Sequence, residues 1–183
     1  MRYRWWVIVA VVLFGAGIAF GLSAPAAGGD GLSGDLGALE ELARFITALP
    51  PWAMFLLIVF KNVTALLFSF VMGPFLLLVP LFSLALNGWV IGAVAGSVVA
   101  EHSIGYLLTG LLPHGILELP AFVMGQAASL SFGATAMLAV FRADRRGQFM
   151  PSLRLNLRYL AIACILLIPA ALIEALVTPR LLK

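Results

Sequence analysis

The apolar positions of this chain form long, uninterrupted runs, and the polar positions are gathered in short gaps between them. The runs span residues 5–22, 52–73, 75–100, 103–140 and 157–177. A helix of about 20 apolar residues crosses the hydrocarbon core of a bilayer, which is about 30 Å thick. The pattern therefore predicts an all-α membrane protein, a bundle of five transmembrane helices that forms a single transmembrane domain over residues 1–183.

The fourth run, residues 103–140, is too long for one crossing, and Pro113, Gly115 and Pro120 interrupt it. Each proline removes a backbone donor, and a glycine weakens a helix. Irregular backbone at membrane depth is tolerated only where protein or a watery cavity surrounds it. We therefore expect one net crossing here, with a broken or re-entrant element around residues 112–121.

The segment from Asp35 to Leu49 follows a different, amphipathic pattern. Its apolar residues recur at spacings of three and four, and its charged residues occupy the other faces. This spacing is typical of a helix, and Asp35 stands where a side chain caps the first turn. We expect a short interfacial amphipathic helix around residues 35–49. A small helix packed against protein loops is the alternative.

The arginine residues indicate the topology. Arg2 and Arg4 precede the first run, and five arginines lie between residues 142 and 158. Basic residues accumulate on the cytoplasmic side of membrane proteins. We expect a multi-pass protein of the cell membrane with its N-terminus in the cytoplasm and its C-terminus outside. The first run is longer than the apolar core of a signal peptide, about 7–15 residues, so we interpret it as a retained signal anchor.

The composition excludes several classes of function. Hydrophobic residues make up 63% of the 183 residues and charged residues 10%, whereas a soluble domain carries about 25% charged residues. The net charge of +3 comes from arginines beside apolar runs rather than from a basic patch, so the expected partner is the lipid bilayer and not nucleic acid. The single cysteine, Cys164, has no partner for a disulfide.

Polar residues inside the apolar runs are the candidates for function. A lysine at membrane depth costs about 2.5–3.5 kcal/mol unless it finds a partner or reaches the interface. Lys61, next to Asn62, should therefore contact Glu118 or the region of Asn87. The alternative is that Lys61 pairs with Glu101 or Glu118 and only fixes the helix register.

His114 and Glu118 are the second pair of candidates, four residues apart between two prolines. In a helix they share one face, and if a helix begins near Glu118 the carboxylate lies at its positive end. Both arrangements place ionisable groups at a broken helix, where transporters build binding sites. A metal site needs three or four convergent ligands, so His114 and Glu118 are weak candidates. We expect no metal, no cofactor and no catalytic residue.

Glycines recur every four residues at Gly88, Gly92 and Gly96, and a similar pair, Gly17 and Gly21, lies in the first run. Such spacing strips one helix face of side chains and allows backbones to approach closely. We interpret the pattern as helix packing, either within one chain or between the subunits of a homo-oligomer.

These polar and glycine positions resemble the stage II sporulation protein M family. The resemblance covers about residues 52–178, and its most specific part is the sequence LPHGILELPA at residues 112–121. It implies a five-span membrane protein with motif positions Asn62, Asn87, His114 and Glu118. The member that gives the family its name resembles a membrane scaffold for peptidoglycan-remodelling enzymes in spore-forming bacteria. Many relatives occur in organisms that never sporulate.

Three functions remain open at this point. The first is a non-enzymatic scaffold that recruits membrane or envelope proteins. The second is a permease-like transporter of a small ligand or ion, and the third is an intramembrane hydrolase that uses Glu118 and His114. A polar cluster that is dry and satisfied by protein groups favours the scaffold, whereas a cluster that lines a wet cavity favours the transporter.

Overall fold

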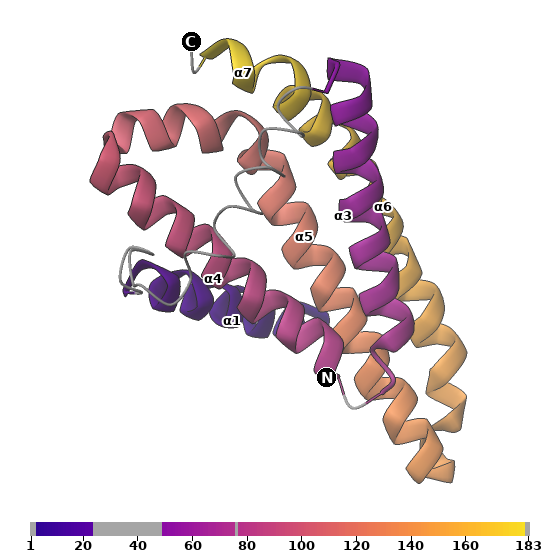
Figure 1. Cartoon of the computed structure of the whole chain (residues 1–183). Coiled ribbons are helices and arrows are strands. Elements are labelled where there is room, and N and C mark those ends of the chain that lie inside the picture. Colours follow the sequence, from indigo (N-terminus) through magenta and orange to yellow (C-terminus); the bar gives the residue numbers. More distant parts are fainter. Residues whose placement is uncertain (1–2, 24–48, 76, 182–183) are drawn as a thin grey trace, which may run out of the picture.

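The computed structural model describes residues 3–23, 49–75 and 77–181, and these residues are almost entirely helical. The helices are α1 (Tyr3–Ser23), α3 (Pro51–Met72), α4 (Leu78–Glu101), α5 (Ile104–Phe141), the 3-10 helix η1 (Ala143–Gln148), α6 (Phe149–Leu176) and α7 (Thr178–Leu181) (Figure 1). Among the described residues, five helical segments are long and apolar enough to cross a membrane. The predicted all-α, five-span fold class is thus confirmed. The amphipathic helix predicted around residues 35–49 lies, except for its last residue, outside the described residues.

The helices form two groups that share α5. The lower part of α5 runs beside α3 and α6, whereas α1 and α4 pack on each other and cross this group (Figure 1). Ala128 and Phe132 of α5 belong to the apolar core against α3 and α6. Ala127 and Leu130 of the same helix belong to the core against α1 and α4. α5 is therefore the central element of the fold.

The break predicted around residues 112–121 is a bend instead. α5 is a continuous helix of 38 residues with Pro113 and Pro120 inside it. A proline removes one helical hydrogen bond, and the helix bends at that place while the turns on either side keep their bonds. Figure 1 shows the first turns of α5 lying across one end of the molecule before the helix turns into the bundle. The bend accommodates a helix that, straight, would be about 57 Å long.

The glycines predicted to mediate packing join α1 to α4 within one chain. A Cβ atom on Gly17 would lie 2.6 Å from the carbonyl oxygen of Ala85 and 3.1 Å from the Cα of Gly88. Gly21 meets Gly92 and its neighbours in the same way, whereas Gly96 has looser surroundings. Because the obstructing atoms belong to the backbone, they cannot rotate away from an added side chain.

The outer surface of the helices is apolar. Phe20, Phe60 and Val140 are each 71% exposed. Exposed aromatic and branched side chains of this number are unfavourable in water but suit the acyl chains of a bilayer. The structure therefore describes a multi-pass membrane protein, as the apolar runs predict.

Candidate functional site

Three of the polar residues predicted from the sequence, Asn62, His114 and Glu118, meet where α5 bends. The side-chain amide of Asn62, on α3, donates a hydrogen bond of 2.9 Å to Oε1 of Glu118, on α5. Both side chains are half-buried. The two residues are 56 positions apart in the chain, so the bond joins two separate helices. It also fixes the position of one oxygen of the carboxylate.

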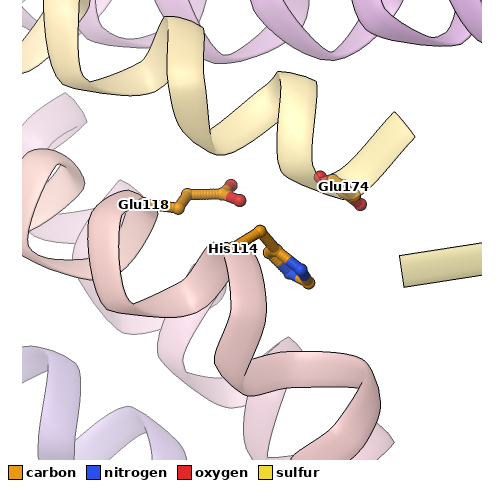
Figure 2. A group of neighbouring side chains, drawn as sticks. All are labelled: His114, Glu118 and Glu174. Atoms are coloured by element: carbon orange, nitrogen blue, oxygen red, sulfur yellow. The ribbon is translucent and has the colours of Figure 1, made fainter. Parts of the chain in front are cut away.

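Glu174, near the end of α6, completes this group. One ligand atom of His114, one of Glu118 and one of Glu174 all lie within 4.8 Å of one another. Figure 2 shows the three side chains extending into the space between α5 and the end of α6. We refer to His114, Glu118 and Glu174 as the bend cluster.

The sequence analysis did not single out Glu174. The signal was present, because Glu174 is the only acidic residue in the apolar run 157–177, and an ionisable residue inside a span is by default a candidate for function. The run ends only three residues later, so the glutamate resembles an ordinary boundary residue. Sequence spacing within one run also cannot show that α6 ends beside the bend of α5.

His114 has its own neighbour at the start of α7. Its Nδ1 atom lies 3.4 Å from the hydroxyl oxygen of Thr178. His114 and Glu118 are four residues apart on α5, so they share one helix face, as one of the two arrangements considered from the sequence requires. The bend cluster itself therefore comes from α5 and α6, and its hydrogen-bonding neighbours Asn62 and Thr178 come from α3 and α7.

Lys61 lies beside the bend cluster and is not bonded to it. It is exposed, and no ion pair forms between Lys61 and an acidic group of the described residues. Asn62, one residue further along α3, makes the contact with Glu118 that we expected of Lys61, because successive residues point about 100° apart around a helix.

Asn87 lies apart from the bend cluster, although we predicted from the sequence that it belongs to the same polar cluster as His114 and Glu118. It is exposed on α4, and its side-chain amide donates to the carbonyl oxygen of Ser83 at 2.8 Å. It lines an open groove of about 560 Å³ between α3 and α4. The groove is otherwise lined by small and apolar residues: Ala65, Phe68, Ser69, Leu78, Val79, Phe82, Ser83 and Leu86. We refer to it as the α3–α4 groove.

A polar chain connects this groove to the interior of the bundle. Gln126 of α5 is fully buried, and its side-chain amide donates to the Ser83 hydroxyl at 2.9 Å. The amide of Asn87 reaches the same hydroxyl at 3.5 Å. The sequence analysis missed Gln126 and Ser83, because uncharged polar residues are common in apolar runs and only their juxtaposition makes them notable.

The bend cluster offers one imidazole and two carboxylates in a half-buried setting. Two carboxylates at this separation repel each other, and the repulsion is strong where the surroundings have a low dielectric constant. The arrangement can bind a cation or share a proton. Glu101 and His102 are the other acid–histidine pair, and both are exposed at the end of α4.

Comparison with known proteins places these features in a family. A family model described as stage II sporulation protein M matches residues 10–179. Among curated proteins, Uncharacterized protein MJ0706 of Methanocaldococcus jannaschii is 28% identical over 125 residues, which cover 67% of this chain. The match spans about half of that relative, 55% of its length. No solved structure matches the chain.

Proposed function

The chain belongs to the stage II sporulation protein M family, and from this premise we propose that it is a non-enzymatic membrane scaffold that recruits a partner protein within the bilayer. The proposed contact is the α3–α4 groove, and the proposed occupant is a transmembrane helix of the partner. Exposed Asn87 is the observation that carries the proposal.

An exposed asparagine is out of place on a lipid-facing surface. Asn87 follows the start of α4 by nine residues, about 14 Å of helix, so it lies near the middle of a membrane about 30 Å thick. Within the described residues its carbonyl oxygen accepts no hydrogen bond. Lipid tails provide no hydrogen-bonding group, so the amide favours a protein neighbour.

The groove suits a helix that carries a hydrogen-bonding side chain. Its lining is mainly apolar, with Ser69, Ser83 and Asn87 as the polar exceptions. Small residues allow close approach of helices in lipid, and Asn, Gln, Ser and Thr side chains hydrogen-bond between them. A contact of this kind contributes about 0.6–2 kcal/mol, and the apolar packing around it adds more.

The orientation that we propose keeps both basic segments in the cytoplasm. The ring of Tyr3, beside Arg4, stacks on the ring of Tyr159, beside Arg158, with 3.7 Å between the ring centres. This contact supports a common side for the two segments. The charge bias of membrane proteins then assigns that side to the cytoplasm.

Photo-crosslinking in native membranes tests the scaffold. A benzophenone amino acid replaces Phe82, which is 68% exposed in the groove, and in a matched control it replaces Phe20, which is 71% exposed on α1. We expect position 82 to yield an adduct with one membrane protein, identified by mass spectrometry, and position 20 to yield lipid adducts.

The dependence on Asn87 makes the test specific. Asn87→Leu keeps the branched shape of the side chain and its number of heavy atoms and removes its amide, so it should abolish the protein adduct from position 82. Adducts with lipid alone at both positions would contradict the proposal. An adduct with the mass of two copies of this chain would also contradict it, because the groove would then be occupied by a second copy of the chain and not by a recruited partner.

A further inference from the structure

The bend cluster brings three potential metal ligands together from two helices. His114 and Glu118 share a face of α5, and Glu174 faces them from α6, with one ligand atom from each within 4.8 Å of the others (Figure 2). One nitrogen and two oxygen donors are a common ligand set for a transition metal. Pairs of neighbouring carboxylates are frequent in proteins, but an imidazole that meets them inside a span is not an ordinary solvated charge cluster.

Two further residues hold the ligands in the manner of an outer coordination shell. Asn62 donates to one oxygen of Glu118, and the other oxygen accepts no hydrogen bond from the part of the chain that the structure describes. The Thr178 hydroxyl oxygen lies 3.4 Å from Nδ1 of His114, where it can accept a hydrogen bond from the Nδ1–H group, and that tautomer leaves the lone pair of Nε2 for a metal. Metal-binding histidines and carboxylates are typically oriented by bonds of this kind.

The charges of the bend cluster also favour a cation. Glu118 and Glu174 are both half-buried, and within the described residues neither forms an ion pair. A bound divalent ion cancels the charge of both carboxylates at once, which the single ammonium group of Lys61 cannot do.

The bend cluster is reached from one end of the bundle. Glu174 follows Arg158 by 16 residues, about 24 Å of helix. With Arg158 at the cytoplasmic boundary of a core about 30 Å thick, Glu174 lies close to the opposite boundary. In the orientation proposed above, ions would therefore reach the bend cluster from the outer surface without crossing the membrane.

From this geometry we propose that His114, Glu118 and Glu174 bind a divalent transition-metal ion, with Zn²⁺ as the ion whose ligand preferences fit best. Zinc takes nitrogen at about 2.0–2.1 Å and oxygen at about 2.0–2.2 Å, so its ligand atoms lie about 3.4 Å apart. The ligand atoms lie within 4.8 Å of one another, and side-chain rotations that move each of them by about 1 Å bring them to that spacing. Mg²⁺ and Ca²⁺ prefer oxygen alone, so the imidazole disfavours them.

Such an ion would fasten the end of the chain to the bend of α5. Glu174 lies near the end of α6, and Thr178 begins α7. With one ligand from α6 and two from α5, the metal would hold these elements at the outer end of the bundle. Its role would therefore be structural, and binding should raise the stability of the folded chain.

Zinc binding to the purified full chain tests this proposal. The chain is prepared in detergent with a tag that lacks histidine, stripped with a chelator and titrated with ZnCl₂ by equilibrium dialysis and elemental analysis. We expect one zinc ion per chain and a higher unfolding temperature in zinc. A chelator should reverse both effects.

The variants separate the bend cluster from other acid–histidine groups. Glu174→Gln and His114→Gln should each weaken zinc binding more than 100-fold. Asn62→Leu should weaken it about 10–100-fold, as expected for an outer-shell residue. Glu101→Gln and His102→Gln change the same residue types in the exposed pair and should leave the affinity unchanged.

A second measurement does not depend on the folding of any variant. Cobalt(II) added to the stripped wild-type chain should give visible absorption bands of a four- or five-coordinate nitrogen and oxygen site, and zinc should remove them. Absence of saturable zinc binding to the wild-type chain would overturn the proposal. Equal binding by Glu174→Gln and Glu101→Gln, or displacement of zinc by equimolar Mg²⁺, would overturn it as well.

Discussion

Some polar side chains of this protein bond to one another between helices, and another, Asn87, faces outward. Asn62 and Glu118 bond to each other across helices, and Asn87 faces outward from α4. The bond between Asn62 and Glu118 lies within the chain, so it contributes to the fold. Asn87 has no hydrogen-bond donor for its side-chain carbonyl oxygen among the described residues, so it is the better candidate for a contact with another molecule.

Removing Glu118 should damage the fold, and removing Glu101 should not. Glu118→Ala leaves the Asn62 amide without its acceptor in a half-buried place, which costs about 1–3 kcal/mol. Glu101 is exposed, so Glu101→Ala should change the free energy of unfolding by less than about 0.5 kcal/mol. Thermal unfolding in detergent, without added metal, compares the two variants. Equal losses would show that the bond between Asn62 and Glu118 does not stabilise the chain.

At the scale of the helices, the packing of α1 on α4 depends on glycine. Gly17 is buried against the backbone of α4, whereas a Cβ atom on Gly15, on another face of α1, would meet nothing within 4 Å. The two glycines thus form a matched pair, one at a close helix contact and one facing the membrane.

Gly17→Val should destabilise the chain and Gly15→Val should not. The valine at position 17 would have to displace the backbone at Ala85, and overpacking of this kind costs about 1–3 kcal/mol. The unfolding temperature of each variant in detergent is the measurement. If both variants lose the same amount, the cost reflects the helix propensity of valine, and the close contact with α4 is not important.

Hydropathy was sufficient to predict the helices, because the length of an apolar run is a direct consequence of bilayer thickness. It was insufficient for the bend of α5, since a proline lowers helix stability but does not determine whether the chain bends or breaks there. Asn62, His114 and Glu118 were found as polar islands in apolar runs. The sequence did not predict the role of Glu174 or the distance of Asn87 from the bend cluster. Both depend on which helices lie side by side, and side-chain packing decides this, not the spacing of apolar residues.

We expect the N-terminus and the arginine-rich segment 142–158 to lie on the cytoplasmic side of the membrane. We propose single cysteines at Gly147 and Arg180 in a Cys164→Ser background, because both positions are exposed. A membrane-impermeant maleimide should label position 180 in intact cells and position 147 only after permeabilisation. Labelling of position 147 in intact cells would reverse the proposed orientation.

Native mass spectrometry of the chain released gently from its own membranes tests the scaffold most directly. A recruited partner requires a complex whose mass exceeds the 19.5 kDa of the chain by a value that is not a multiple of it. We predict such a complex for the wild-type chain and its dissociation into the free chain for Asn87→Leu. A wild-type chain that is released alone, or a complex that Asn87→Leu leaves unchanged, would contradict recruitment through the α3–α4 groove.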